Sequence, residues 1–394
     1  MDTTQPLTLL GNLSPQQFMQ RHWQKKPLLI RQALPGLKPL LSRAKLFELA
    51  GRDEVESRLV QRLPQRQPAP KSRPGKAVDK VPVWSMKQGP FPRRALPGLG
   101  VSNWTLLVQG VDLYSAAIRS LMDRFRFVPD ARLDDVMVSF ATDGGGVGPH
   151  FDSYDVFLLQ AAGTRRWTIG KQKNLDLVEG APLKILQNFE PQQSFDLEPG
   201  DMLYLPPRYA HDGMAVGECM TYSIGFRAPR QGELAQELLQ RLSDEAGSRD
   251  KLYRDAKQPA VANAAEIPNA LLEFAFEAVQ KSLDNPLALV QVLGEHLTEP
   301  KAQVWFEALQ EPVATLRAVA TMHLHLNLHQ RSRMLYAGGH IFINGESFEA
   351  SGCDLDLMQQ LANQRQLAPA DVRRLSAGAQ ELLLDWLNNG WLHA

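Results

Sequence analysis

The sequence of 394 residues lacks the features that mark secreted, membrane-spanning and generally nucleic-acid-binding proteins. Its two cysteines, Cys219 and Cys353, are too few for a disulfide framework and fit a reducing, cytoplasmic compartment. It has no apolar run of membrane-spanning length and no basic leader, so we expect neither a membrane span nor secretion. Lys and Arg number 43, as do Asp and Glu, and this balance argues against a generally basic nucleic-acid binder.

What the sequence does contain is a set of metal-ligating residue types. The segment GPHFD places His150 and Asp152 two residues apart, and His211 follows in LPPRYAH. If His150 and Asp152 lie in a strand, their side chains point to the same side, because strand side chains alternate. Two imidazoles and one carboxylate form the facial triad of non-haem iron(II) oxygenases, which leaves metal positions open for co-substrate and oxygen. An HxD pair alone is weak evidence, since most such pairs are surface accidents.

Short strand-like segments surround these residues. They are rich in β-branched and aromatic residues, are separated by Gly, Pro or Asp turns, and lie at 135–140, 155–160, 165–169, 201–205 and 221–226. The glycine run at 144–146 permits positive φ angles and a close backbone approach before the first ligand. The sequence therefore predicts a sheet curled into a barrel around the triad.

Three further histidines, His323, His325 and His329, lie close together in the sequence. They alternate with leucines, which favours polar positions along an apolar segment over a second metal site. Of the nine histidines in the chain, only His150 and His211 lie beside barrel-like strands with Gly or Pro spacing.

A pair of arginines follows the first ligand segment, in the sequence GTRRW. In a strand, Arg165 and Trp167 lie on one face and Arg166 on the other. A guanidinium can bind a carboxylate through two parallel hydrogen bonds, so Arg165 is a candidate to hold the distal carboxylate of a dicarboxylic co-substrate. A pair of surface arginines explains the spacing equally well.

With these motifs, the sequence resembles a known family, the bacterial ribosomal oxygenases of the JmjC group. The matching stretches cover about the first 230 residues and are RHWQKKP at 21–27, NW at 103–104, the segment 144–152, YDVF at 154–157, RRW at 165–167, EPGD at 198–201, PP at 206–207 and YSIGFRAP at 222–229. The resemblance implies a mainly β catalytic domain, a double-stranded β-helix of the JmjC or cupin type. It also implies an α-helical dimerisation unit and a winged-helix C-terminal domain.

The resemblance also implies roles for single residues. His150, Asp152 and His211 match the ligands of iron(II), and Arg165 stands where the family anchors the far carboxylate of 2-oxoglutarate. Ser139 matches a position whose hydroxyl reaches that co-substrate, although an ordinary strand serine is the alternative. The implied activity uses molecular oxygen to hydroxylate an arginine of a large-subunit ribosomal protein, L-sixteen, with release of succinate and carbon dioxide.

An arginine substrate requires acidic or aromatic groups near the metal. Asp143, Tyr154, Asp155 and Tyr209 are near enough in sequence, but the sequence assigns none of them, and Asp155 is better explained as a supporting carboxylate. Three alternatives stay open. They are the same chemistry on a histidine of another ribosomal protein, a cupin-type metal enzyme that uses no keto acid, and a non-catalytic metal-stabilised scaffold.

A basic, proline-rich insertion interrupts the first domain at about residues 62–95. From Arg58 to Arg94 there are ten Lys or Arg residues and one acid, Asp79. We expect the stretch to begin in a helix-like segment and to continue as a mobile, solvated loop. A basic arm that contacts ribosomal RNA or an acidic partner is the alternative.

The length exceeds what one hydrophobic core usually supports, and we divide the chain into three domains. These are the oxygenase domain at 1–228, a helical dimerisation domain at 229–310 and a winged-helix domain at 311–394. Apolar spacing predicts helices at 232–246 and 267–283. Strands at 334–336 and 341–343 with helices at 354–363 and 377–388 complete the winged-helix pattern. Residues 354–394 hold five acids and three arginines, so we expect this domain to contact protein rather than DNA. The homodimer is what the resemblance implies, and without the resemblance the helices after residue 229 are interpreted as packed against the barrel.

Overall fold

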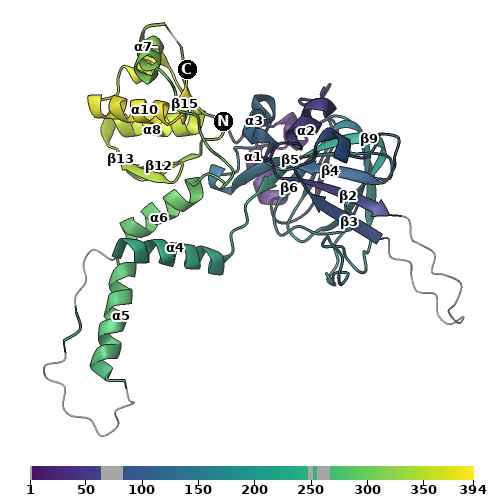
Figure 1. Ribbon diagram of the computed structural model, residues 1–394, viewed down its shortest axis with the longest axis horizontal. Coiled ribbons are helices and arrows are strands. Elements are labelled where there is room, and N and C mark those ends of the chain that lie inside the picture. Colours follow the sequence, from purple (N-terminus) through teal and green to yellow (C-terminus); the bar gives the residue numbers. More distant parts are fainter. Residues whose placement is uncertain (1, 64–82, 247–251, 255–266, 323) are drawn as a thin grey trace, which may run out of the picture. The chain divides into compact units, whose positions relative to one another are not determined.

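The computed structural model describes residues 2–63, 83–246, 252–254, 267–322 and 324–394, and the chain divides into two units, Met1–Ala228 and Pro229–Ala394 (Figure 1). The first unit consists mainly of β-strands, and the second of helices with two small sheets. In the described part of the chain, no helix combines the length and apolar character needed to cross a membrane.

The described strands of the first unit form one antiparallel sheet. They are β1 (Leu28–Ile30), β2 (Ser57–Leu63), β3 (Val83–Gln88), β4 (Trp104–Val108), β5 (Leu133–Ala141), β6 (Val156–Gly170), β7 (Gln193–Leu197), β8 (Met202–Leu205) and β9 (Ala210–Phe226). Their order is β1-β8-β6-β9-β5-β4-β2-β3, with β7 also paired to β6. The first part of β6 pairs with β8, and its later part pairs with β7. The strand β9 pairs with β6 along both parts. Register shifts near Ala162 interrupt this long pairing, as in a sheet that curls.

The predicted strands are confirmed, with two differences in extent. The segments predicted at 155–160 and 165–169 are two parts of the single strand β6, and β9 begins at Ala210, so it carries His211. The prediction that His150 and Asp152 lie in a strand is wrong. They lie in an irregular segment, in which His150 forms an isolated bridge with His211 of β9.

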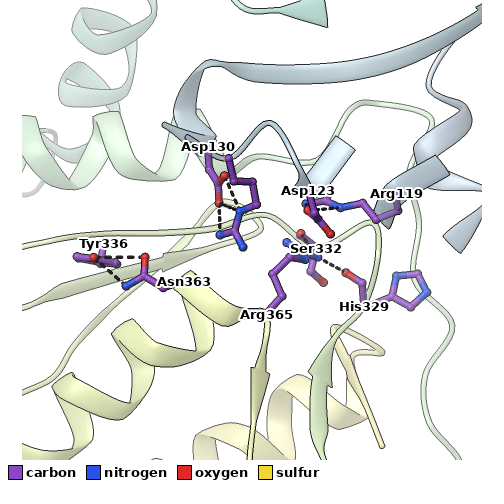
Figure 2. Close-up of polar contacts among 9 residues, drawn as sticks. Arg119, Asp123, Asp130, His329, Ser332, Tyr336, Asn363 and Arg365 are labelled. Atoms are coloured by element: carbon purple, nitrogen blue, oxygen red, sulfur yellow. Dashed lines mark hydrogen bonds and ion pairs between the residues drawn. The ribbon is translucent and has the colours of Figure 1, made fainter. Parts of the chain in front are cut away.

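Short helices cover one face of this sheet. They are α1 (Pro15–Arg21), α2 (Arg43–Leu49) and α3 (Ala116–Asp123), with the 3-10 turns η1 (Thr8–Leu10), η2 (Arg93–Ala95), η3 (Val111–Leu113) and η4 (Asp130–Arg132). The Phe18 ring of α1 lies 5.4 Å from that of Phe157, and the Phe47 ring of α2 lies 5.2 Å from that of Phe140. Arg119 and Asp123 form an ion pair along α3 at 2.9 Å (Figure 2). The helices thus close the outer face and leave the inner face for a site.

The basic stretch is partly built into the sheet. β2 pairs with β3 from Arg58 opposite Gln88 to Leu63 opposite Val83, and β2 pairs with β4 on its other side. The predicted helix-like start is therefore wrong, because pairing with two neighbouring strands overrides a local helical pattern. Residues 64–82, to which the predictions of a mobile loop or an RNA-binding arm apply, lie outside the described residues.

The second unit contains the helices α4 (Gln231–Ala246), α5 (Asn269–Leu283), α6 (Pro286–Thr298), α7 (Pro312–Met322), α8 (Gly352–Gln364), α9 (Pro369–Val372) and α10 (Ala377–Asn388). Its strands are β10 (Leu326–Leu328), β11 (Met334–Ala337), β12 (His340–Ile343), β13 (Glu346–Glu349), β14 (Gln366–Leu367) and β15 (Leu392–His393). They form two sheets, β14-β10-β15 and β11-β12-β13. The helices and strands predicted for this region are confirmed, and α6 was not predicted. The division into a helical and a winged-helix domain at 310 stays a prediction.

Side-chain contacts join the sheet β11-β12-β13 to helices of the same unit. On α6, a Cβ atom at Gly294 would lie 2.4 Å from the Phe342 ring, so glycine lets the helix pack closely on the sheet. Tyr336 and Asn363 hydrogen-bond between β11 and α8 (Figure 2). Arg365, at the end of α8, donates to the carbonyl oxygens of His329 and Ser332 at 2.8 and 3.1 Å (Figure 2).

The histidine-rich segment before β11 packs within this unit. Nδ1 of His329 accepts a hydrogen bond from the backbone N–H of Arg331 at 3.2 Å, and its ring lies against Phe306. Burial and the nearby Arg331 lower the pKa of His329 to about 4, so the ring is neutral at neutral pH. His323 lies outside the described residues.

Candidate metal centre

Three predicted ligands converge at one end of the curled sheet. Ligand atoms of His150, Asp152 and His211 all lie within 4.8 Å of one another. The two histidines form a reciprocal backbone pair, with N–H to O distances of 2.9 and 2.8 Å, and their ring centroids are 4.2 Å apart. Together with the hydrogen bonds of Gly144 and Gly145 to Ala215 and of the Arg208 N–H to the Asp152 carbonyl oxygen, this bridge brings the two distant segments together. Nε2 of His211 lies 3.7 Å from Oδ2 of Asp152, so one ion can contact both groups.

Each of the two imidazoles is oriented by a hydrogen bond to the backbone carbonyl oxygen two residues before it. Nδ1 of His150 lies 2.9 Å from the carbonyl oxygen of Gly148, and Nδ1 of His211 lies 2.9 Å from that of Tyr209. A carbonyl oxygen can only accept, so each contact requires the proton on Nδ1 and leaves the lone pair on Nε2. Metal-binding histidines commonly have this outer hydrogen bond, which fixes the tautomer and the ring orientation.

Burial keeps His211 in the state that a metal ligand requires. The side chain is 2 % exposed, and burial together with nearby His150 lowers the pKa of His211 to about 4. The imidazole is therefore neutral at neutral pH, with its Nε2 lone pair available. Trp167 packs beside it, with ring centroids 5.8 Å apart.

Arg165 lies on the same inner face as the His211 ligand. Along β6 and β9, Arg165 lies opposite Ala215, Trp167 opposite Gly213 and Ile169 opposite His211, and directly paired strand residues share a face. The predicted alternation is confirmed. Arg165 is buried at 4 % exposure, whereas Arg166 is exposed and pairs with Asp196 at 2.7 Å.

The guanidinium of Arg165 has unused hydrogen-bonding capacity. Its Nε contacts Sγ of Cys219 at 3.4 Å, and its carbon lies 5.8 Å from the centre of the Trp167 ring. Its Nη2 is buried and has no hydrogen-bond partner in the described part of the chain. A buried cationic donor without an acceptor is costly, so this position fits an anionic ligand inside the barrel.

Comparisons with known proteins agree with this geometry. Residues 120–234 match the JmjC domain family, and residues 281–393 match the ROXA-like winged helix. A relative from Escherichia coli, named ribosomal protein uL16 3-hydroxylase, is 33% identical over 84% of this chain and 85% of its own length. The chain belongs to the JmjC-domain ribosomal oxygenases. A probable ribosomal oxygenase from Haemophilus influenzae is 34% identical over 57% of this chain and 52% of its own length.

Solved structures of this oxygenase family share the fold. The X-ray structure of Escherichia coli ycfD aligns with a TM-score of 0.80 at 30% identity, covering 95% of this chain and 96% of that one. A structure of the same protein in complex with cobalt and 2-oxoglutarate aligns with a TM-score of 0.76 over the same shares. The predicted fold class, a JmjC-type β domain followed by helices and a winged helix, is confirmed.

Ser139 lies deep inside this oxygenase fold. It is 3 % exposed, lies opposite Thr221 on β9, and its hydroxyl contacts the Thr221 carbonyl oxygen at 3.5 Å. Ala141, two residues along β5 and therefore on the same face, packs against Ala215 and Cys219. Ser139 thus lies on the face to which Arg165 belongs, and its predicted contact with a co-substrate stays a prediction.

The four candidates for the substrate pocket, none of which the sequence assigned, lie in different surroundings. Asp155 is fully buried and accepts from the Tyr204 hydroxyl at 2.6 Å and from Gln24 at 3.1 Å, so it supports the fold. Asp143 accepts from the Gly217 N–H at 2.8 Å and fixes a turn. Tyr209 supplies the carbonyl that orients His211. Tyr154 lies beside the triad with its side chain, where the charge of Asp152 acts on its phenol.

A buried carboxylate that the sequence reasoning missed lies close to Tyr154. Asp135, on β5, is 3 % exposed and accepts from Nε2 of Gln109 at 2.8 and 3.1 Å. Gln109 in turn accepts from Arg58 at 3.3 Å. Burial, and then the charges of Asp152 and Asp135, raise the pKa of the Tyr154 phenol. The signal was present in the sequence DVMVSF, in which Asp135 shares the inner face with Ser139.

A second cluster of ligating residue types lies in the second unit. Glu237, His296 and Glu299 also bring ligand atoms within 4.8 Å of one another. Arg241 already pairs with both carboxylates, at 2.8 Å to Glu237 and 2.6 Å to Glu299. Arg241 thus supplies the positive charge that a metal ion would otherwise bring to these carboxylates. The cluster joins α4 to the end of α6.

Proposed function

We propose that the protein is an iron(II)- and 2-oxoglutarate-dependent oxygenase that hydroxylates an arginine of ribosomal protein uL16 and releases succinate and carbon dioxide. The observation that carries this proposal is the facial set of His150, Asp152 and His211 with Arg165 on the same inner face, whose buried Nη2 has no hydrogen-bond partner among the described residues. The similarity to the uL16 3-hydroxylase, over most of both chains, supports the substrate. A ribosomal substrate also favours a cytoplasmic location.

The first part of the proposal concerns the metal. Nε2 of His150, Nε2 of His211 and a carboxylate oxygen of Asp152 would hold iron(II), because their arrangement leaves one side of the ion open. Iron(II), 2-oxoglutarate and oxygen together supply the oxidising chemistry that converts a C–H bond into a C–OH group. The chain contributes two imidazoles whose Nδ1–H groups are fixed by the carbonyls of Gly148 and Tyr209.

The second part concerns the keto acid. Arg165 would hold its distal carboxylate, since Nη2 offers a buried donor that lacks an acceptor and Nε has only a thiol as partner. Solved complexes of ycfD with cobalt and 2-oxoglutarate, and with cobalt and succinic acid, support this choice of co-substrate and product. The hydroxyl of Ser139 would be a further donor on this face. A cupin-type enzyme without a keto acid would leave Arg165 with no carboxylate to bind.

The third part concerns the substrate side chain. Asp135 and Tyr154 would receive a guanidinium, because a buried carboxylate can pair with it and an aromatic face can pack on it. Relatives named histidyl-hydroxylase match shorter parts of this chain, for example 20% of it at 34% identity. This difference in coverage, together with Asp135, favours arginine over histidine as the substrate.

The fourth part concerns assembly, for which we propose a homodimer through α5. This helix exposes apolar side chains along much of its length, among them Leu272 at 38%, Phe276 at 70% and Val279 at 58%. Apolar side chains at helical spacing that face solvent in one chain mark a surface for another helix. A second copy of α5 would cover them.

A turnover assay tests the chemistry and the substrate together. Purified protein with iron(II), 2-oxoglutarate and oxygen should convert uL16 into a product heavier by one oxygen atom, with matching release of succinate. Fragmentation should place the oxygen on an arginine, and His150→Ala should abolish both signals. Oxygen found on a histidine would reject the arginine proposal, whereas a mass gain without keto-acid consumption would reject the co-substrate.

A further inference from the structure

The winged-helix part contains a groove that the proposed chemistry does not use. Two hollows, of ≈ 460 and ≈ 180 Å³, lie between β13 and the helices of the same unit. Both are lined by Phe348 of β13 and by Leu382 and Trp386 of α10, so they adjoin. We name the two hollows together the β13–α10 groove. Its floor is aromatic, with the rings of Phe348 and Trp386 5.4 Å apart and edge to face.

The walls of the groove are acidic. Glu349 and Asp354 line the larger hollow, Glu346 and Asp385 line the smaller, and no Lys or Arg is among the described residues that line either. Asp354 accepts from the N–H and hydroxyl of Ser376 at 2.9 and 2.6 Å. Four carboxylates without a lining cation, in a chain of zero net charge, favour a cationic ligand and repel phosphate groups.

A buried donor in the groove lacks an acceptor. Trp386 is 1 % exposed, and its Nε1 has no hydrogen-bond partner in the described part of the chain. An indole N–H can only donate, and leaving such a group buried and unsatisfied is unfavourable. Trp386 lines both hollows, so a ligand there lies against the ring whose N–H has no acceptor among the described residues.

The position of β13 adds a third observation. It is an outer strand of the sheet β11-β12-β13, and among the described strands it pairs only with β12. An outer strand presents backbone groups that an extended peptide can pair with. The groove therefore combines carboxylates, an aromatic floor, an indole N–H without an acceptor among the described residues and an outer strand edge. A basic peptide in extended conformation could contact all four features.

We propose that the β13–α10 groove binds a lysine- or arginine-rich segment of the protein substrate, apart from the residue that is hydroxylated. This inference rests on the proposed function, because it takes uL16 as the bound protein. Proteins that contact RNA phosphates carry such basic segments, which makes a ribosomal protein a suitable occupant. The groove would raise affinity for the whole substrate without taking part in the chemistry.

The test compares two triple variants of the full-length protein. The groove variant is Glu346→Gln/Glu349→Gln/Asp385→Asn, which keeps Trp386 and the Asp354 contacts intact. The control is Asp356→Asn/Glu311→Gln/Glu381→Gln, three exposed acids of the same unit that do not line the groove. Both change the net charge equally. Each is assayed with intact uL16 and with a short uL16 peptide that contains only the hydroxylated region.

For intact uL16, we expect the groove variant to raise KM by about tenfold, with kcat unchanged. The KM for the short peptide should stay the same in all three proteins, and the control variant should behave as wild type with both substrates. An unchanged KM for intact uL16 would overturn the proposal, as would an equal rise in the control variant or with the short peptide. Failure of wild type to hydroxylate either substrate would instead reject the proposed function.

A direct measurement follows the indole of Trp386. The chain has seven tryptophans, and Trp386→Phe identifies the signal of this one in a spectrum of the ¹⁵N-tryptophan-labelled protein. Intact uL16 should shift the Trp386 N–H signal in the direction of stronger hydrogen bonding. A signal that uL16 leaves unmoved, or that responds to duplex DNA instead, would overturn the proposal.

Discussion

Replacement of Arg165 by methionine should weaken 2-oxoglutarate binding while leaving the fold intact. Methionine keeps an apolar stem of similar reach beside Trp167 but removes the guanidinium. Within the described residues, Nη2 has no hydrogen-bond partner and Nε contacts the Cys219 thiol, so the protein itself loses only one weak hydrogen bond at these nitrogens. The bound carboxylate, in contrast, loses its buried cation.

The magnitude follows from that difference. Removal of one partner of a buried, hydrogen-bonded charge pair costs about 2–5 kcal/mol, and each 1.4 kcal/mol is about tenfold in affinity. We therefore expect the Kd for 2-oxoglutarate to rise by roughly 30-fold to several thousand-fold. Titration calorimetry without oxygen, with manganese(II) in place of iron, measures this Kd without turnover.

The neighbouring arginine provides the matched control. Arg166 has the same charge but is exposed and pairs with Asp196, so Arg166→Met should change the Kd by less than about fivefold. A keto acid without a distal carboxylate, 2-oxobutanoate, should bind weakly to wild type and equally weakly to Arg165→Met. The reasoning is refuted if Arg165→Met binds 2-oxoglutarate like wild type, or if it loses as much affinity for 2-oxobutanoate.

Three further predictions concern the fold and the assembly. Asp155→Asn should lower the free energy of unfolding by about 2 kcal/mol, because Tyr204 then donates to a neutral group, and an unchanged urea midpoint would contradict this. Gly213→Ala places a Cβ atom 2.6 Å from the Trp167 ring, so we expect a loss of about 1–3 kcal/mol and weaker metal binding, measured by denaturation and metal titration. Phe276→Glu should convert a dimer into a monomer in light scattering, and a wild-type protein that is already monomeric would reject the proposed interface.

The triad and the arginine could be predicted because their signals are local. His150 and Asp152 stand two residues apart, and the alternation around Arg165 needs only the knowledge that the segment is a strand. The reason given for the first pair was nevertheless incorrect. Backbone pairing of His150 with His211, over a long sequence separation, orients the ligands in an irregular segment.

What the sequence did not reveal depends on contacts between segments that are far apart in the chain. The hydrogen bonds that Asp135 accepts from Gln109, and its place near Tyr154, join such segments. The nitrogens of Arg165 and Trp386 that lack hydrogen-bond partners among the described residues are also properties of the packed chain. The strand β2 was missed because the start of the basic stretch was interpreted as helix-like, and pairing with β3 and β4 overrides that local pattern.

The central claim is most directly tested by the intact mass of uL16 from ribosomes of cells with and without this gene. We predict that uL16 from the deletion strain is lighter by one oxygen atom, that the wild-type gene restores the mass, and that His150→Ala does not. An identical mass of uL16 in all strains, with an oxygen lost from another ribosomal protein or from none, would contradict the account.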